Sequence, residues 1–589
     1  MRQVSRLILI FALCTSLAAQ TAAAPKKRAA TATRKPQPVT AEDIKSLRDA
    51  LAAQQQQIQE LRQELRQRAQ ATQQAEQAAQ QAQSAATSAQ QATASSLQKA
   101  DAAQATANAL KTDVSDLKLN ATKAALSLQD EQKRVTDLVE NPLAIHYKGI
   151  TITPGGFLDA STVWRQHGMA SDVNTPFNAI PFAGADAHHL SEFFGSGRPS
   201  RITLLMQGKI SKAAFTGYYE LDWLSAGVTS NNNQSNSYTN RQRQLWGQAA
   251  LTNGWSFTGG QMWSLVTETK NGLDNRTEAV TSTIDHAYNV GFSWARQWGF
   301  RVTKNFSNKV WLGFSIENAQ TLMTAHGNLN NFTFGNAGAG GGVYNATANY
   351  SYNVSPDYVI KAAWQPKYGH YEIVGLISPL RDRVYPNATA TPASTAGAFN
   401  DTRIGGGVAV NARWLVYNKH IEFGVHGMGG DGIGRYGASS LPDATIRPDG
   451  TLALLHSYQG LGTLEFHYPK FDVYFNGGSE YVSRYWQLRN PTTAVGYGSP
   501  LFSNAGCLVE ALPGAGGFAS NGPAACNSDT KNLFEFSTGF YIKFYNGPKG
   551  RLQWGPQYSH IRRSLWNGVG GAPNADQNMF LTSFRYYLP

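Results

Sequence analysis

An unbroken heptad register runs from Ile44 to Leu138 and constrains this chain more than any other feature of its sequence. Two series of core positions, one from Ile44 and one from Leu47, contain 28 residues, of which 22 are apolar. A seven-residue repeat of this length predicts a left-handed coiled coil, and therefore an oligomer. The rod would be about 140 Å long. Leucine, alanine and β-branched residues mix at the core positions, so the composition does not choose between a dimer and a trimer.

The first 24 residues have the pattern of a secretory signal peptide. Two arginines precede an apolar run from Leu7 to Leu17, and mostly small residues follow up to Ala24. Cys14 suggests a lipoprotein, but Leu13 stands where a small residue is expected. We therefore expect residues 1–24 to be removed as a signal peptide.

A basic segment precedes the predicted rod, and a proline ends it. Residues 25–40 are basic and contain proline, which indicates a flexible solvated tail or a cationic contact with an acidic surface such as the cell wall. The coiled coil then occupies residues 41–140. It ends at Asn141-Pro142, because a residue before proline is disfavoured in the α region.

From residue 144 the hydrophobic period changes from 3.5 to 2. Phe215, Gly217, Tyr219 and Leu221 form one face, while the residues between them point the other way. Segments of about ten residues with one apolar face are typical of transmembrane strands. The sequence therefore predicts an all-β, antiparallel transmembrane barrel over residues 144–589. The same alternation recurs in the segments 310–317, 408–414, 463–468 and 534–545.

The composition supports a barrel over a soluble domain. Charged residues make up only 15% of the chain, whereas about a quarter is usual in soluble proteins. Beyond the signal there is no apolar stretch long enough for a transmembrane helix. The net charge is +12, of which +7 belongs to the barrel region with 33 basic and 26 acidic residues. This excess is too small to indicate nucleic-acid binding.

The connections between strands alternate in length. Asn546 to Gly550 reads as a hairpin turn, whereas Ser225 to Asn240, Asn328 to Val343 and Thr492 to Lys531 are long. At about ten residues per strand plus connections, 16 strands fit into the region and 18 are the alternative. A soluble array of β-sandwiches is the competing architecture, and it would need more regular turns.

Particular motifs resemble a known family of porins. The segments 241–247 and 254–265, with Gly-Gln-Met-Trp-Ser at 260–264, resemble the strand–turn–strand signature of trimeric outer-membrane porins of the DcaP-like type, which are related to the phosphate-selective porins. The segments 201–208 and 217–222 resemble the hairpin upstream, and 156–160 resembles the first strand. The resemblance implies a trimer of 16-stranded barrels with a helical coiled coil in the periplasm and a pore narrowed by an inward loop.

The resemblance also places candidate site residues. In the family, the segment 267–288 holds the constriction loop, where fixed charges near the path act strongly. A solvated extracellular loop is the alternative. Strand alternation separately predicts inward charges of both signs along the wall, without a one-sided basic ladder. The constriction candidates are Glu268, Lys270, Asp274, Arg276, Glu278 and Asp285, and the lumen candidates are Lys361, Arg413, Glu422, Lys543 and Arg563.

Two cysteines remain after the signal, and they flank a loop rich in glycine and alanine. In an oxidising compartment, Cys507 and Cys526 are expected to form one disulfide. No phosphate-binding loop and no nucleophile–base signature is present, so an outer-membrane enzyme is disfavoured. No cofactor or metal is expected.

The sequence therefore predicts an outer-membrane porin for passive diffusion of small hydrophilic solutes. A weak preference for small anions follows from the resemblance and from the basic barrel region. The expected partners are two further copies of the chain in a homotrimer, outer-membrane lipid and the solutes, with peptidoglycan as a candidate partner of the basic tail. The alternative function is an envelope tether, in which the rod links the outer membrane to peptidoglycan and the barrel is only its anchor.

Overall fold

We describe the protein from a computed structural model. The described residues are 115–118, 120–125, 127–129, 131, 144–225, 238–337, 348–513, 515–517 and 522–589. The chain divides into two compact units, residues 1–131 and 132–589. In the first unit all described residues are helical. The predicted signal, the basic tail and most of the predicted coiled coil lie outside the described residues. No described helix is long and apolar enough to cross a membrane.

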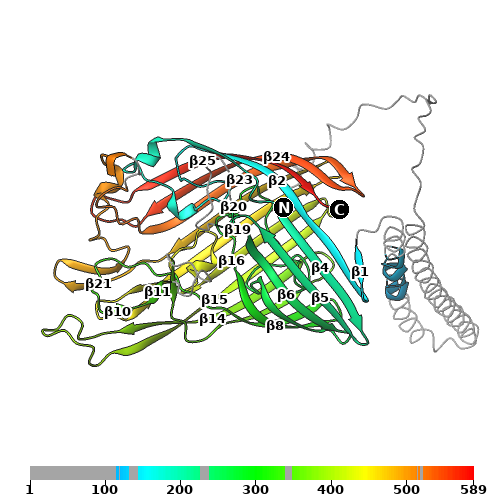
Figure 1. Cartoon of the computed structure of the whole chain (residues 1–589), viewed down its shortest axis with the longest axis horizontal. Coiled ribbons are helices and arrows are strands. Elements are labelled where there is room, and N and C mark those ends of the chain that lie inside the picture. Colours follow the sequence, from blue (N-terminus) through cyan, green and yellow to red (C-terminus); the bar gives the residue numbers. More distant parts are fainter. Residues whose placement is uncertain are drawn as a thin grey trace, which may run out of the picture. The chain divides into compact units, whose positions relative to one another are not determined.

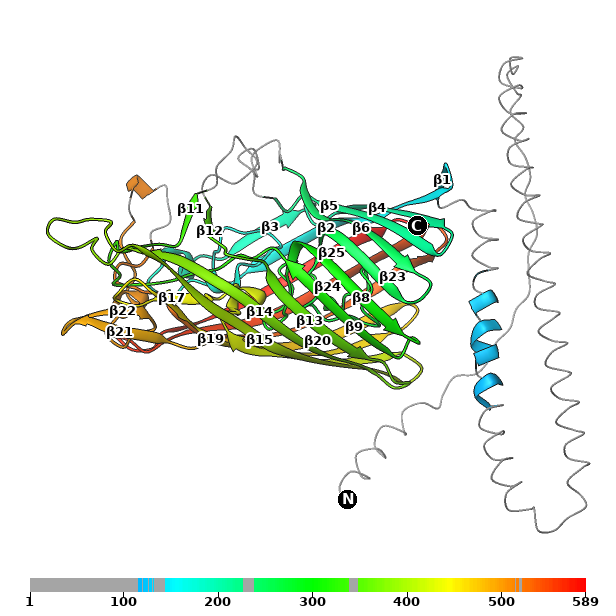
Figure 2. The ribbon, with the colours of Figure 1, turned by 90° about the horizontal axis from the view of Figure 1, so that it is seen from below.

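The second unit contains a closed antiparallel barrel of 16 strands (Figures 1 and 2). The barrel closes where β25 pairs with β2, from Phe157 opposite Tyr587 to Arg165 opposite Met579. The predicted 16-strand barrel is therefore confirmed, and the alternative of 18 strands is wrong. The barrel strands are β2 (Ile150–Arg165), β4 (Arg201–Ile210), β5 (Ala213–Asp222), β6 (Arg241–Leu251), β7 (Trp255–Trp263), β8 (Arg296–Phe306), β9 (Val310–Glu317), β13 (Asp357–Trp364), β14 (His370–Val384), β15 (Phe399–Val416), β16 (Ile421–Asp431), β19 (His456–His467), β20 (Phe471–Val482), β23 (Thr530–Gly547), β24 (Gly550–Leu565) and β25 (Asn574–Tyr587).

Shorter elements extend the wall or lie in the connections. β1 pairs with the start of β2, and β10 pairs with the end of β14. β3 pairs with the last residues of β2, beyond the part of β2 that pairs with β4. The short strands are β1 (Ile145–Tyr147), β3 (Glu192–Ser196), β10 (Phe332–Thr333), β11 (Gly335–Ala337), β12 (Asn349–Ser351), β17 (Ala444–Ile446), β18 (Leu452–Leu454), β21 (Tyr485–Asn490) and β22 (Thr493–Tyr497), and the 3₁₀ helices are η1 (Phe177–Ala179), η2 (Asp186–His189), η3 (Gly434–Tyr436), η4 (Ala505–Leu508) and η5 (Ala515–Gly517).

The strands form because their sequences alternate with a period of two. In β9, Leu312 and Phe314 are exposed on the outside, whereas Trp311 and Ser315 are buried inside. The strand β23 repeats this pattern, with phenylalanines outside and polar residues such as Glu535 inside. An apolar outer face combined with a polar inner face is what a barrel needs to lie in lipid.

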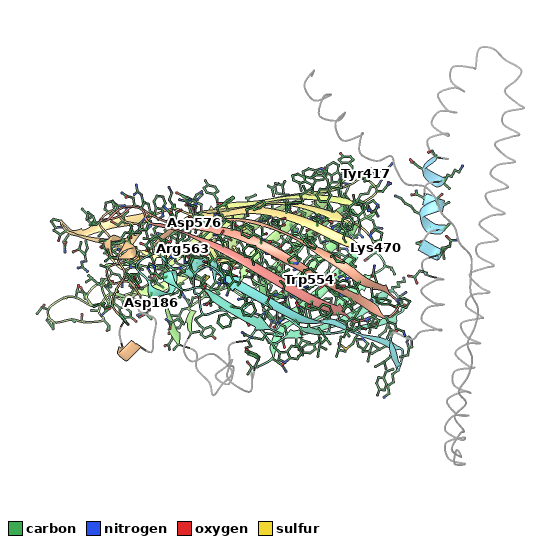
Figure 3. All side chains as sticks on the ribbon, turned by 90° about the horizontal axis from the view of Figure 1, so that it is seen from above. Asp186, Tyr417, Lys470, Trp554, Arg563 and Asp576 are labelled. Carbon is green, nitrogen blue, oxygen red and sulfur yellow. A yellow bond between two sulfur atoms is a disulfide. The ribbon has the colours of Figure 1, made fainter. Side chains whose placement is uncertain are left out.

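The two ends of the barrel differ. At one end, short turns join the strands, and Tyr417 and Lys470 lie in two of them; at the other end, long loops such as the one that contains Asp186 project (Figure 3). Long connections at one end and short turns at the other match the outer-membrane pattern. Four long connections matter below: the first loop (166–200), the inward loop (264–295), the sixth loop (432–455) and the seventh loop (483–529).

Apolar residues of these four loops form a buried core inside the barrel. Phe177 of the first loop, Ile284 of the inward loop, Leu441 of the sixth loop and Tyr497 of the seventh loop belong to one buried cluster. The cluster also contains inward residues of β20, β23, β24 and β25, such as Ile561. The loops therefore occupy the side of the barrel next to these strands, and the remaining space lies toward β6–β8.

Candidate permeation pathway

The inward loop is fixed across the barrel by carboxylates of the wall. The backbone N–H of Thr269 donates to Glu372 of β14 at 3.1 Å, and the N–H of Val290 donates to Glu535 of β23 at 2.8 Å. The N–H of Gly291 donates to Glu480 of β20 at 2.8 Å. Buried N–H groups need acceptors, and charged acceptors form the stronger bonds. The loop therefore lies against the wall inside the barrel and does not project into solvent.

Three of the predicted constriction residues are buried or half-buried in this arrangement. Glu268 accepts from the Arg413 guanidinium at 3.0 Å, and Glu278 forms a backbone bridge with Thr269. One oxygen of Asp285 accepts the N–H of Ala287 at 2.8 Å, whereas the other oxygen is buried without a partner among the described residues. Burial raises the pKa of the Asp285 carboxyl above its usual range.

The other three predicted constriction residues are accessible. Lys270 is exposed, and its ammonium lies 3.7 Å from Glu422. Asp274 is exposed, and so is Arg276, whose guanidinium lies 4.9 Å from the centre of the Tyr218 ring. These three side chains can meet a passing solute, whereas Glu268 and Asp285 cannot do so without leaving their partners.

The predicted lumen residues point inward, but their side chains are engaged. Lys361 is fully buried and donates to Glu372 at 2.9 Å and to the Thr267 carbonyl at 2.8 Å. The side chains of the other four have partners as well. Arg413, Glu422 and Lys543 form ion pairs, whereas Arg563 donates only to uncharged oxygens of the described residues. Arg413 pairs with Glu268 and Glu422, Lys543 pairs with Asp472, and Arg563 donates to Thr530, Ile180 and Ser528.

Four arginines outside the predicted site residues lie beside the remaining space, and three of them, Arg241, Arg243 and Arg296, line it. They are Arg201 of β4, Arg241 and Arg243 of β6, and Arg296 of β8. Two carboxylates of β5 form ion pairs with three of these arginines. Asp222 lies 2.8 Å from Arg241 and 2.9 Å from Arg243. Glu220 pairs with Arg243 and lies 3.8 Å from Arg201. Four guanidinium groups against two carboxylates leave positive charge in excess.

Arg296 has no carboxylate partner among the described residues. Its guanidinium lies 5.3 Å from the centre of the Trp263 ring and 5.2 Å from that of Trp294. Its Nε and Nη1 atoms, and the indole N–H of Trp294, are buried and have no hydrogen-bond partner in the part of the chain that the structure describes. Unpaired donors are costly unless water or a solute accepts from them.

The open space beside Arg296 consists of two adjoining cavities. One has a volume of about 350 Å³ and the other about 460 Å³, and Arg241, Trp294, Arg296 and Ser440 line both. His286 of the inward loop lines the second cavity. Burial, and then the charges of Arg585 and Arg201, lower the pKa of His286 well below its usual range. The same field would favour an anion in these cavities.

A signal for this cluster was present in the sequence. Arg241 and Arg243 are two residues apart at the start of a predicted strand, so they must share a face. Arg201 and Arg296 also begin strands that follow long loops. Their proximity could not be read from the sequence, because it depends on which strands are neighbours and on where the inward loop leaves room.

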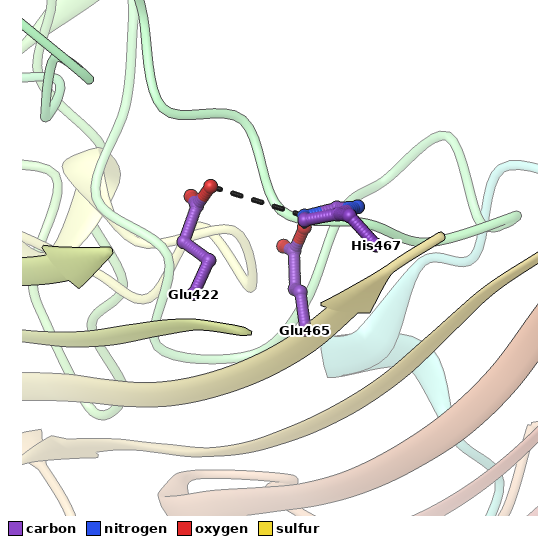
Figure 4. A group of neighbouring side chains, drawn as sticks. All are labelled: Glu422, Glu465 and His467. Atoms are coloured by element: carbon purple, nitrogen blue, oxygen red, sulfur yellow. Dashed lines mark ion pairs between the residues drawn. The ribbon is translucent and has the colours of Figure 1, made fainter. Parts of the chain in front are cut away.

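A second cluster lies between β16 and β19, near the short-turn end. Glu422, Glu465 and His467 each direct one ligand-type atom toward the others, and these atoms lie within 4.8 Å of one another (Figure 4). His467 Nε2 is 3.2 Å from Glu465 and 3.9 Å from Glu422.

In the seventh loop, Cys507 and Cys526 form a disulfide.

Comparison with known proteins shows a similarity of fold to solved structures only. No protein-family model matches the chain, and no curated protein matches it. Among solved structures, the outer membrane channel DcaP of Acinetobacter baumannii aligns with 12% identity and a TM-score of 0.51, over 75% of this chain and 99% of that one. An anion-selective porin from Comamonas acidovorans aligns with 9% identity and a TM-score of 0.40, over 74% and 100%, respectively. The expected resemblance to outer-membrane porins is confirmed for the fold of the barrel.

Proposed function

We propose that this protein is an outer-membrane porin through which small hydrophilic solutes diffuse passively. The closed barrel has an apolar outer face and a polar inner face, as insertion into a bilayer requires. The inward loop narrows the lumen and leaves the cavities beside Arg296 open. The long loops would face the cell exterior and the short turns the periplasm. The likeness to DcaP supports the fold on which this proposal rests.

The proposed path favours small anions, and Arg296 is the observation that carries this preference. Its guanidinium lines both cavities, has no carboxylate partner among the described residues and retains unpaired donors. Anions would exchange water for these donors, whereas cations would meet an excess of positive charge. The exposed Lys270 and Arg276 of the inward loop would act in the same direction, and Asp274 would oppose them.

Charge-removal variants test this preference in planar bilayers under a salt gradient. Two unit charges about 4 Å apart interact by about 1 kcal/mol in water. For a permeating ion beside a fixed charge, this energy corresponds to about a five-fold change in a permeability ratio. We expect Arg296→Gln to lower the anion-to-cation permeability ratio by up to about this factor without closing the channel. Arg562→Gln is the matched control, because Arg562 is exposed and lies outside both cavities. An unchanged reversal potential in Arg296→Gln would refute the assigned role of Arg296.

For the assembly, we propose a homotrimer with the coiled coil in the periplasm. The heptad register between residues 44 and 138, which needs partner helices to bury its apolar seam, supports an oligomer. The resemblance of the segments 241–247 and 254–265 to trimeric porins supports three chains. The basic segment 25–40 would then contact peptidoglycan. Deleting residues 25–40 should reduce co-sedimentation of the protein with peptidoglycan, and equal co-sedimentation would count against this contact.

The envelope tether is the second candidate function, and the same heptad register favours it. A predicted rod of about 140 Å is longer than trimerisation alone requires. The two functions are compatible in one molecule. A folded barrel that does not conduct would favour the tether alone.

A further inference from the structure

The cluster of Glu422, Glu465 and His467 has the donor set of a transition-metal site. The imidazole Nε2 and two carboxylate oxygens converge, and zinc accepts both ligand types. Ligand atoms around a tetrahedral zinc ion lie about 3.3 Å apart. The separation of 3.2 Å between His467 and Glu465 meets this value, and that of 3.9 Å between His467 and Glu422 requires only a small movement.

The orientation of His467 suits a ligand. Its Nδ1 lies 3.1 Å from Asp472, and Asp472 is held in turn by Lys543 at 2.8 Å. A carboxylate on Nδ1 fixes the ring and its tautomer, so that Nε2 is presented to the two glutamates. This carboxylate–histidine arrangement is the usual outer support of a metal-bound imidazole.

One oxygen of Glu422 has no hydrogen-bond donor among the described residues and is available to a ligand. The Glu422 side chain is 6% exposed, and Arg413 binds its Oε1. Its Oε2 accepts no hydrogen bond from any described residue, and it faces His467 Nε2. The Glu465 oxygens accept from Ser282 at 2.8 Å and 3.2 Å, which leaves lone pairs free for a metal.

The charges around the cluster leave room for a cation. His467 lies between two carboxylates, so a metal ion must displace a proton from its ring. The network then holds four carboxylates against three permanent cations. Lys270, the nearest exposed cation, has a flexible stem and can move away. The carboxylates are those of Glu268, Glu422, Glu465 and Asp472, and the cations are Lys270, Arg413 and Lys543.

We propose that Glu422, Glu465 and His467 bind a divalent first-row transition ion, with Zn²⁺ as the preferred occupant and water as the fourth ligand. Asp472 acts as a positioning residue. The ion would join β16 and β19 of the wall to Ser282 of the inward loop, near the short-turn mouth of the lumen. It would reach the site from that mouth, because His467 is about one-third exposed. This site does not depend on the proposed anion preference.

Metal binding to tag-free, full-length protein in detergent tests the proposal. After treatment with a chelator and its removal, the protein should bind one Zn²⁺ per chain in equilibrium dialysis, and Co²⁺ should show the absorption of a four-coordinate ion. His467→Ala should abolish both signals. Asp472→Asn should weaken binding about 10- to 100-fold while it leaves the stoichiometry unchanged.

His456→Ala is the matched control. His456 also lies next to a carboxylate, that of Asp431 at 2.8 Å, but it is at the opposite end of β19 and belongs to no such cluster of described residues. This variant should bind the metal like the wild type. If His467→Ala does not fold, as judged by heat-modifiable migration in gels, Glu465→Gln replaces it and should also lose the ion. Absence of Zn²⁺ binding in the wild type, or equal binding in a folded His467→Ala or Glu465→Gln variant, would overturn the proposal.

Discussion

Gly478 of β20 lies so close to Val290 of the inward loop that a Cβ at position 478 would be 1.8 Å from the Val290 carbonyl oxygen. This contact sets the distance between the loop and the wall on which the loop rests. The neighbouring N–H of Val290 is held by Glu535, and that of Gly291 by Glu480. The position of the inward loop therefore depends on a residue without a side chain.

We expect Gly478→Ala to displace the inward loop. The carbonyl of Val290 is backbone and cannot rotate away, so the loop must shift or lose its bonds to Glu480 and Glu535. The single-channel conductance should change, and its current noise should rise. Gly477→Ala is the matched control, because a Cβ there meets nothing within 4 Å. Equal conductance and noise in Gly478→Ala and the wild type would contradict the assigned contact.

A second prediction concerns the buried ion pair of Lys361 and Glu372. Both side chains are fully buried and lie 2.9 Å apart. Lys361→Met should destabilise the barrel by about 3–5 kcal/mol, because it leaves a buried carboxylate without its cation. Chemical unfolding monitored by tryptophan fluorescence measures this loss.

The double variant Lys361→Met/Glu372→Gln separates the pair from its packing. It should recover part of the loss, because no unpaired charge remains. Lys209→Met, at an exposed position near the end of β4, should stay within about 0.5 kcal/mol of the wild type. A Lys361→Met variant as stable as the wild type would show that the pair is not needed.

A third prediction concerns pH. The pKa of Asp285 is raised by burial, so the folded protein favours the neutral carboxyl. The contribution of this group to stability is therefore fully present below the ordinary carboxyl pKa of about 4, and it is lost as the pH rises through the raised folded value. Asp285→Asn removes this dependence. The difference in Tm between wild type and variant should change in favour of the wild type as the pH falls from neutral. A difference that does not vary with pH would exclude the effect.

The sequence predicted the wall of the barrel well because strand alternation is a local signal. The residues Tyr218, Glu220 and Asp222 point inward as the pattern indicated, and 16 strands form as the length of the region suggested. Hairpin formation at 546–550 also follows from local turn chemistry.

The interior could not be predicted in the same way. Alternation shows that Lys361 faces inward, but not that the inward loop covers it and uses its charge. Likewise, Arg241 and Arg296 are 55 positions apart in the chain, and only the order of the strands and the path of the loop place them around one space. Apolar residues of long loops, such as Phe177 and Ile180, gave no periodic signal and yet form a core inside the barrel.

The central claim is that the barrel conducts and prefers anions, and single-channel recording of the purified full-length protein under a salt gradient tests it most directly. We predict that the current changes in three equal steps, one for each pore of a trimer, and that the reversal potential indicates a preference for anions. A reversal potential on the cation side would contradict the role of the arginine cluster around Arg296. A folded, inserted barrel that does not conduct would contradict the proposed porin function itself.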